Sequence, residues 1–411
     1  MALVCFGLRR VLGRSDAKLE SLKADVRRHL KNGNRGSLGC PVQINYEHSS
    51  RPILEVTLLP TPQDHWSPSG ETRLIPLLSG RQVSMWSEVG RRGYRLCAKI
   101  LDAELRSLFE IDVIPLPRQH FGFDVVALRA GGFAAAWVEK NLIKLRSYNE
   151  DGSCRKTTPV SLTTKPGGRV QLAVFPNGEI GIGYTDFLAI QTEGRLFLCM
   201  VSPSAWHFTM TCLQNGRLVR VEMIDKHPSY HGGPPRYELC GSLINRAGMV
   251  LGQFNLDVPA TIVGDTYSHP DHLAISSLSG GGFVVVWTQL GHHLGNSIQA
   301  RIFDETGTAL GETIIVTAAT TSASVNEPSV IACDDGSFAV AWSENEDPMI
   351  VHRLQLFNND GSRHGPTINC NDAISEGRSA IALARIASGQ VVGRWVQNGK
   401  IQTIFFETSL V

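Results

Sequence analysis

The 411-residue sequence lacks long apolar runs and lacks an excess of charge of one sign. No stretch approaches the roughly 20 consecutive apolar residues of a membrane-spanning helix, so the sequence predicts none. The 39 Lys and Arg residues balance 38 Asp and Glu residues, which argues against a general nucleic-acid or membrane surface. Residues 1–35 are the exception, because basic residues outnumber acidic ones there.

Paired cysteines and the usual catalytic and cofactor motifs are also missing. The nine cysteines are scattered, with no C-x-x-C pair, which favours reduced core thiols over a disulfide framework. There is no phosphate-binding Walker loop, no G-x-S-x-G elbow and no strand–helix G-x-G-x-x-G. Calcium loops of the D-x-D-x-D-G type are absent too. We therefore predict no cofactor and no metal site.

The sequence does contain a short motif that recurs about every 50 residues and ends on an aromatic residue. The best copies are Gly281–Trp287, Asp335–Trp342 and Gly131–Trp137, and weaker copies end at Trp86, Tyr184 and Trp395. A gap of two periods between Tyr184 and Trp287 predicts one degenerate unit at 209–222, without an aromatic anchor. Repeats of this period indicate seven copies of one supersecondary unit.

The residue pattern within each unit predicts β-strands. The best copy predicts strands at 272–278, 283–289, 297–304 and 312–317, separated by turns rich in glycine. Asn-Gly, Asp-Gly and Gly-Gly pairs favour hairpins because glycine and asparagine tolerate the positive φ of tight turns. Four antiparallel strands repeated seven times predict an all-β protein, a seven-bladed β-propeller.

The two ends of the chain suggest how the ring closes. Residues 1–40 form a predicted N-terminal extension with an amphipathic helix from Ser15 or Asp16 to about Lys31. Residues 41–411 form the predicted propeller. Its last unit has only three predicted strands, so we expect Val42–Tyr46 or Ile53–Leu58 to supply the fourth and to close the last blade.

The motif Gly281–Trp287, followed by Ile298–Asp304 and a glycine-rich turn, resembles repeats of bacterial β-propeller proteins. Such repeats often accompany haemolysin-type calcium-binding or adhesin modules. The resemblance is close for 272–316 and 328–357, and looser over the rest of 72–411. It implies the propeller fold and leaves function open, because some related propellers in natural-product pathways catalyse alkyl transfer.

Candidate functional residues follow from the order of strands in a blade. If the strands run A-B-C-D, the A–B and C–D turns share one face, and the B–C and inter-blade loops share the other. Variable loops on a rigid scaffold are where function usually resides. Several histidines fall in such loops of two adjacent units, and imidazoles there can exchange protons near neutral pH. The predicted catalytic or acid–base candidates are His231, His269, His272, His292 and His293.

Charged residues predicted on the same face are candidates for ligand binding; these are Arg91, Arg92, Asp271, Glu344 and Arg378. Two functions remain open from the sequence. One is a binding module that recognises a small molecule, glycan, peptide or protein on the variable-loop face. The other is a propeller enzyme of lyase, cyclase or alkyl-transferring type, with an acid–base pocket over the central channel. Met1–Leu12 does not resemble a secretory signal, so we expect a cytoplasmic protein or one exported without a cleavable signal peptide.

Overall fold

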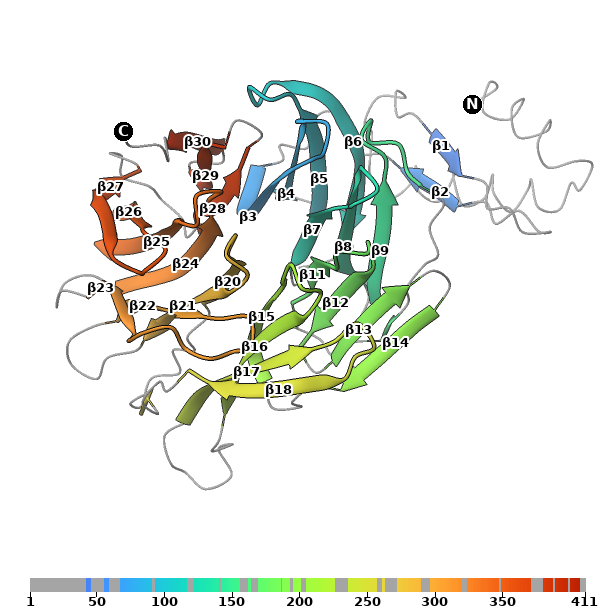
Figure 1. Ribbon diagram of the computed structural model, residues 1–411. Helices are drawn as coiled ribbons and strands as arrows, with labels where there is room; N and C mark the ends of the chain where they lie inside the picture. Colours follow the sequence, from blue (N-terminus) through green and yellow to red (C-terminus); the bar gives the residue numbers. More distant parts are fainter. Residues whose placement is uncertain are drawn as a thin grey trace, which may run out of the picture. The chain divides into compact units, whose positions relative to one another are not determined.

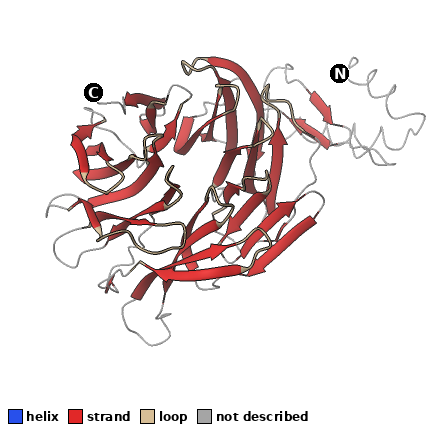
Figure 2. Ribbon diagram, viewed as in Figure 1, coloured by secondary structure: helices blue, strands red, loops and turns tan. Residues whose placement is uncertain are grey.

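The computed structural model describes residues 42–45, 55–58, 67–90, 93–116, 122–139, 142–155, 162–163, 169–185, 187–192, 195–200, 205–225, 236–256, 261–262, 272–289, 296–318, 324–346, 349–370, 380–386, 389–397 and 400–406. The chain divides into two compact units, residues 1–65 and 66–411. Strands dominate the described part, as Figure 2 shows. Among these residues there is no helix with the length and apolar character that crossing a membrane requires.

The larger unit consists of seven antiparallel sheets, which follow one another in chain order (Figure 1). We call them blades 1 to 7. Blade 1 contains β3 (Ser67–Pro76), β4 (Gln82–Gly90), β5 (Gly93–Leu101) and β6 (Ser107–Leu116). Blade 2 contains β7 (Phe123–Ala127), β8 (Phe133–Glu139), β9 (Leu142–Tyr148) and β10 (Leu162–Thr163). Blade 3 contains β11 (Gln171–Val174), β12 (Ile180–Tyr184), β13 (Phe187–Thr192) and β14 (Arg195–Met200).

Blade 4 contains β15 (Ala205–Cys212), β16 (Leu218–Asp225), β17 (Arg236–Ile244) and β18 (Val250–Asn255), and β19 (Thr261–Ile262) pairs with the start of β17. Blade 5 contains β20 (Leu273–Ser277), β21 (Phe283–Gln289), β22 (Ser297–Phe303) and β23 (Ile314–Thr317). Blade 6 contains β24 (Ser324–Ala332), β25 (Phe338–Glu346), β26 (Met349–Phe357) and β27 (Arg363–Asn369). Blade 7 contains β28 (Ala382–Arg385), β29 (Val391–Gln397) and β30 (Lys400–Phe406).

The first strand of every blade lies beside the first strands of its two neighbours. These contacts run from β3 through β7, β11, β15, β20, β24 and β28, and they return from β28 to β3. The sheets therefore form a closed ring, with strand A of each blade at the centre. The sequence-based prediction of an all-β, seven-bladed β-propeller is confirmed, including the degenerate fourth unit.

The A–B turns are the same in all seven blades. In each, the residue that ends strand A pairs with the residue that begins strand B, and a glycine amide donates back to the first residue of the turn. That glycine has φ between 79° and 98° in every blade, a region that residues with a Cβ rarely adopt. In the degenerate blade 4 it is Gly216, so the turn is retained where the aromatic anchor is lost.

The core lies between the blades, on the two faces of each strand B. The aromatic anchor is the fifth residue of strand B in six blades and is at most 8% exposed; the anchors are Trp86, Trp137, Tyr184, Trp287, Trp342 and Trp395. The anchors of blades 2, 3, 5, 6 and 7 each lie in a cluster with residues of the preceding blade; Trp287, for example, packs with Val219 and Val221 of blade 4. The predicted equivalence of these positions is confirmed. In blade 4 the fifth residue of strand B is Glu222.

The predicted closing strand is not seen in blade 7. The two candidate segments form β1 (Val42–Asn45) and β2 (Glu55–Leu58), and these pair with each other, antiparallel. The sheet of blade 7 has three strands among the described residues. Participation of an N-terminal strand in that blade stays a prediction, and the predicted helix near residues 15–31 lies outside the described residues.

The described cysteines fit the expectation of reduced thiols. Cys97, Cys154, Cys212, Cys333 and Cys370 are free thiols. Burial raises the pKa of Cys97 and of Cys370 to about 12, so both thiols are protonated at neutral pH and unreactive as nucleophiles.

Candidate functional site

The connections between strands differ sharply between the two ends of the blades. Because the strands alternate in direction, the A–B and C–D turns lie at one end, and the B–C and inter-blade connections lie at the other, which we call the loop face. The B–C connection has only two residues in five blades, but it spans 226–235 in blade 4 and 290–296 in blade 5. The connection from blade 4 to blade 5 is also long, at 256–272. The connection from blade 6 to blade 7, at 370–381, is long as well. Long B–C connections are therefore confined to two adjacent blades.

Part of the connection from blade 4 to blade 5 is described, and its strand pairing shows that this connection comes back to blade 4. β19 (Thr261–Ile262) pairs antiparallel with Arg236 and Tyr237 at the start of β17. That start is the loop-face end of β17, where the B–C connection of blade 4 finishes. The sheet of blade 4 is thus widened on the loop face, next to the blade that carries His272 and the histidines of 290–296.

Most predicted site residues lie outside the part of the chain that the structure describes; these are Arg91, Arg92, His231, His269, Asp271, His292, His293 and Arg378. His272 and Glu344 are described. His272 immediately precedes β20, is half-buried, and its carbonyl accepts a hydrogen bond from the Thr288 amide at 3.3 Å. Convergence of the histidines on one ligand stays a prediction.

Glu344 has a structural role that its charge alone does not reveal. One carboxylate oxygen accepts a hydrogen bond from Trp342 Nε1 at 3.0 Å, and the other pairs with Arg353 Nε at 2.6 Å. Its side chain is 12% exposed. Glu344 therefore holds the aromatic anchor of blade 6 and is already occupied by two donors.

The same arrangement recurs in other blades. In blade 1, Trp86 Nε1 donates to Glu88 at 2.8 Å, and Arg95 Nε donates to the other oxygen of Glu88 at 2.6 Å. In blades 5 and 7 a glutamine replaces the glutamate, with Gln289 and Gln397 accepting from the anchor indoles. The sequence signal for this hydrogen bond is Trp-x-Glu or Trp-x-Gln. It was missed in the sequence analysis because acidic residues were considered only as ligand-binding groups.

Blade 4 replaces the anchor by a buried ion pair. Arg220, with no exposed surface, pairs through Nε with Glu222, which is 7% exposed. Arg220 also donates to the carbonyls of Phe187 at 3.2 Å and Thr185 at 3.0 Å in blade 3. Its guanidinium lies 4.0 Å from the centre of the Phe208 ring, a cation–π contact. The pair therefore ties blade 4 to blade 3 where an aromatic would otherwise pack.

His352 is a buried histidine that the loop-based reasoning did not consider. It is 1% exposed, its Nδ1 lies 3.1 Å from Ser343 Oγ, and its ring is 5.2 Å from that of Trp395. Burial lowers its pKa from the usual 6.5 to about 4. It is therefore neutral at physiological pH, far from a proton-exchanging role.

His352 should make stability depend on pH. As pH falls below about 6.5 the unfolded chain takes up a proton at this histidine, while the folded chain does so only near pH 4. This part of the stability is complete above pH 6.5 and should decline by about 3 kcal/mol as pH falls to 4. Urea unfolding at pH 7 and 4.5 should show the decline in the native protein and a smaller one in His352→Gln. Equal declines in both proteins would contradict the assignment.

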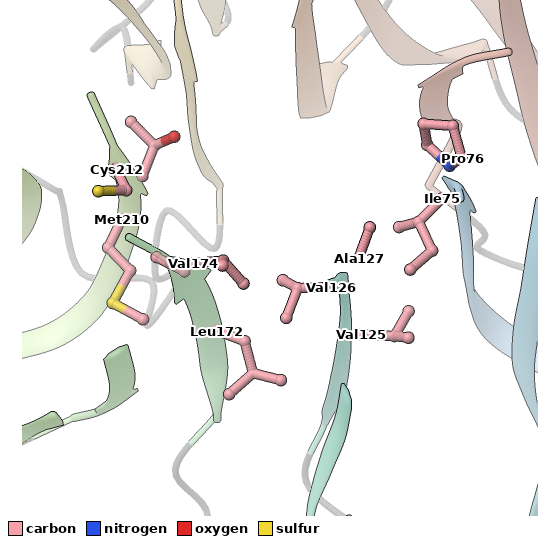
Figure 3. A pocket seen from close by; sticks show the side chains of 11 residues that line it. Ile75, Pro76, Val125, Val126, Ala127, Leu172, Val174, Met210 and Cys212 are labelled. Carbon is pink, nitrogen blue, oxygen red and sulfur yellow. The ribbon is translucent and has the colours of Figure 1, made fainter. Parts of the chain in front are cut away.

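An apolar cavity of about 300 Å³ opens at the centre of the ring. It is lined by the last residues of strand A from blades 1 to 4, among them Ile75, Val126, Val174 and Met210 (Figure 3). These are the ends that lead into the A–B turns, so the cavity lies away from the loop face. Burial raises the pKa of the Cys212 thiol at its edge to about 12. The cavity thus offers apolar contacts and no activated nucleophile.

Among the described residues, no group of three or more His, Cys, Asp or Glu side chains is arranged to hold a metal ion. No family model matches the sequence, and no curated protein matches it.

Several solved structures share the fold at low identity. A protein from Lactobacillus plantarum has a TM-score of 0.48 at 14% identity, covering 76% of this chain and 95% of its own. The NanB sialidase of Streptococcus pneumoniae has a TM-score of 0.45 at 12% identity, covering 86% of this chain and 70% of its own. The α-L-arabinanase of Penicillium chrysogenum has a TM-score of 0.42 at 12% identity, covering 70% of this chain and 93% of its own. At these identities and scores, none of the similarities bears on the activity of this chain.

Proposed function

We propose that this β-propeller is a ligand-binding module that recognises a polar ligand, such as a glycan, peptide or protein, through its loop face. The observation that carries the proposal is the length of the B–C connections, which is large in blades 4 and 5 and only two residues in the other five blades. A rigid ring that presents a few long loops is a common arrangement for recognition. The loops carry His231, His269, His292 and His293, and His272 lies at the base of one of them.

A propeller enzyme has less support. Catalysis by acid–base groups needs titratable side chains that are available to a substrate. Among the described residues, Glu88 and Glu344 at the loop-face ends of their strands are each held by an indole and an arginine. His352 is buried and neutral.

A bacterial source, and a cytoplasmic location or export without a cleavable signal, remain part of the proposal.

The proposal is tested by replacing two histidines of blade 5, one just before strand A and one just after strand B. Binding partners are first found by screening the whole chain on a glycan array and a peptide library, and affinity is then measured by calorimetry. His272→Ala/His292→Ala should weaken binding at least tenfold, equivalent to about 1.4 kcal/mol, with thermal stability nearly intact. The loss is expected because both side chains are predicted to contact the ligand.

The matched control lies at the opposite end of the blades. Leu78 and Gln214 are exposed residues of A–B turns, and the Leu78→Ala/Gln214→Ala double variant should bind normally. Unchanged binding in the histidine variant, with its fold intact, would move the site to the Arg91 and Arg378 side or to the turn face. Binding lost only in the control would place it on the turn face.

A further inference from the structure

The interface between blade 7 and blade 1, which closes the ring, differs chemically from the interfaces on the two sides of blade 5. The first and third residues of strand B, which face the preceding blade, are Phe283 and Val285 in blade 5, and Phe338 and Val340 in blade 6. In blade 1 the corresponding residues are Gln82 and Ser84, 0% and 2% exposed. Two polar side chains are therefore buried at positions that are apolar in blades 5 and 6, beside an apolar cluster of Leu74 with Ile386 and Val392 of blade 7.

A buried arginine faces these polar side chains from blade 7. Arg394, the fourth residue of β29, is 8% exposed, and its Nη1 donates to Ser84 Oγ at 2.5 Å. The equivalent residue of blade 5 is Val286, which is completely buried in an apolar cluster. A single guanidinium thus occupies an apolar position at the closing interface.

Arg394 has no carboxylate partner among the described residues. Its Nε has no hydrogen-bond partner, and no ion pair with it is found in the described part of the chain. Arg220, the other deeply buried arginine, is by contrast neutralised by Glu222. Burial lowers the pKa of Arg394 only to about 10, so it remains charged at neutral pH. An uncompensated buried charge is strongly destabilising, by several kcal/mol, so a counter-charge is required.

Another buried polar group without a partner lies beside Ser84. Gln82 and Ser84 are two residues apart on β4 and share a face. The amide Nε2 and Oε1 of Gln82 are buried without a partner. Ser84 accepts from Arg394 and keeps its own hydroxyl proton to donate. Gln82 and Ser84 therefore offer donors next to a fixed positive charge.

We propose that the closing interface binds a small monovalent anion, such as chloride, between Arg394 and the donors of Ser84 and Gln82. The anion would neutralise the guanidinium and would accept a hydrogen bond from the Gln82 amide, which has no partner. A cation is disfavoured by the arginine. Water alone would satisfy the donors but would leave the charge uncompensated. Because the anion touches both blade 7 and blade 1, its binding would stabilise the closed ring.

The first test uses the unaltered chain. Thermal unfolding is followed while chloride replaces gluconate at constant ionic strength, since gluconate is too large to enter a sealed interface. The melting temperature should rise by about 2–4 °C and then saturate, as expected for a ligand that binds only the folded state. Crystals grown in bromide should show an anomalous peak beside Arg394 Nε. A melting temperature independent of chloride, together with no bromide at the interface, would overturn the proposal.

Variants then locate the effect. Arg394→Met keeps the volume and removes the charge, so the chloride response should disappear. Gln82→Leu removes one set of donors and should shift the chloride midpoint at least threefold, which keeps the test open if Arg394→Met fails to fold. The matched control is Arg146→Met, in which a half-buried arginine stacked over Trp137 of blade 2 is replaced, and it should respond to chloride as the native protein does. A chloride response that persists in both interface variants would also overturn the proposal.

Discussion

Replacing Trp342 by alanine should lower the free energy of unfolding by about 3–5 kcal/mol. The indole is 1% exposed and packs with Val284 and Val286 of the preceding blade, so its removal leaves a cavity between two sheets. Glu344 would also lose the indole N–H that it accepts at 3.0 Å. Urea unfolding monitored by circular dichroism measures the change.

The control for this variant is an aromatic residue outside the interfaces. Phe405 on β30 is 47% exposed, and Phe405→Ala should cost less than about 1 kcal/mol. A loss for Trp342→Ala no larger than for Phe405→Ala would contradict the role of the anchor. Since the anchors occupy equivalent positions, Trp287→Ala should resemble Trp342→Ala.

Replacing Glu222 by alanine should destabilise the protein by about 3–5 kcal/mol, because it removes the carboxylate that pairs with the fully buried Arg220. The carbonyls of Phe187 and Thr185 cannot replace a carboxylate, since they carry no net charge. Unfolding in urea at neutral pH measures the loss.

A double variant separates the charge from the packing. Arg220→Met/Glu222→Leu removes both charges and supplies apolar groups of similar size, so it should recover most of the stability lost in Glu222→Ala. The exposed pair of Arg385 and Asp334 provides a second comparison, and Asp334→Ala should cost less than about 1 kcal/mol. If the double variant is no more stable than Glu222→Ala, uncompensated charge is not the cause.

The seven-bladed fold was predictable because each repeat contains the same local residue patterns. Glycines with positive φ, aromatic anchors and β-branched runs each have a local cause, and they recur in the same order along the chain. Even blade 4 could be placed, because the turn at Gly216 survives the loss of the anchor. The pattern could not predict that the Arg220–Glu222 ion pair replaces that anchor in blade 4. Arg220 reaches carbonyls more than 30 residues away in the chain, and a contact of that kind has no local signature.

The candidate site was predictable only in its position on the fold. Strand order assigns loops to a face, and connection lengths identify blades 4 and 5. The roles of individual residues depend on partners in other strands, which a single sequence does not display. Glu344 illustrates the difference, because its loop-face position suggested a ligand contact while its oxygens hold Trp342 and Arg353. For Arg394, nothing in the sequence distinguishes a solvated arginine from a buried one.

The contact between Arg394 and Ser84 also has a consequence for synthesis of the chain. These two residues are 310 positions apart, and their blades meet only when the ring closes. At typical elongation rates of 5–20 residues per second, about 15–60 s pass between the appearance of one and the other. During that interval the polar face of blade 1 on the ribosome-bound chain has no partner blade. That face also carries Leu74 and Trp86. Its Gln82 and Ser84 positions tolerate water far better than the phenylalanine and valine at the same positions of blades 5 and 6, and this lowers its tendency to aggregate while the nascent ring is open.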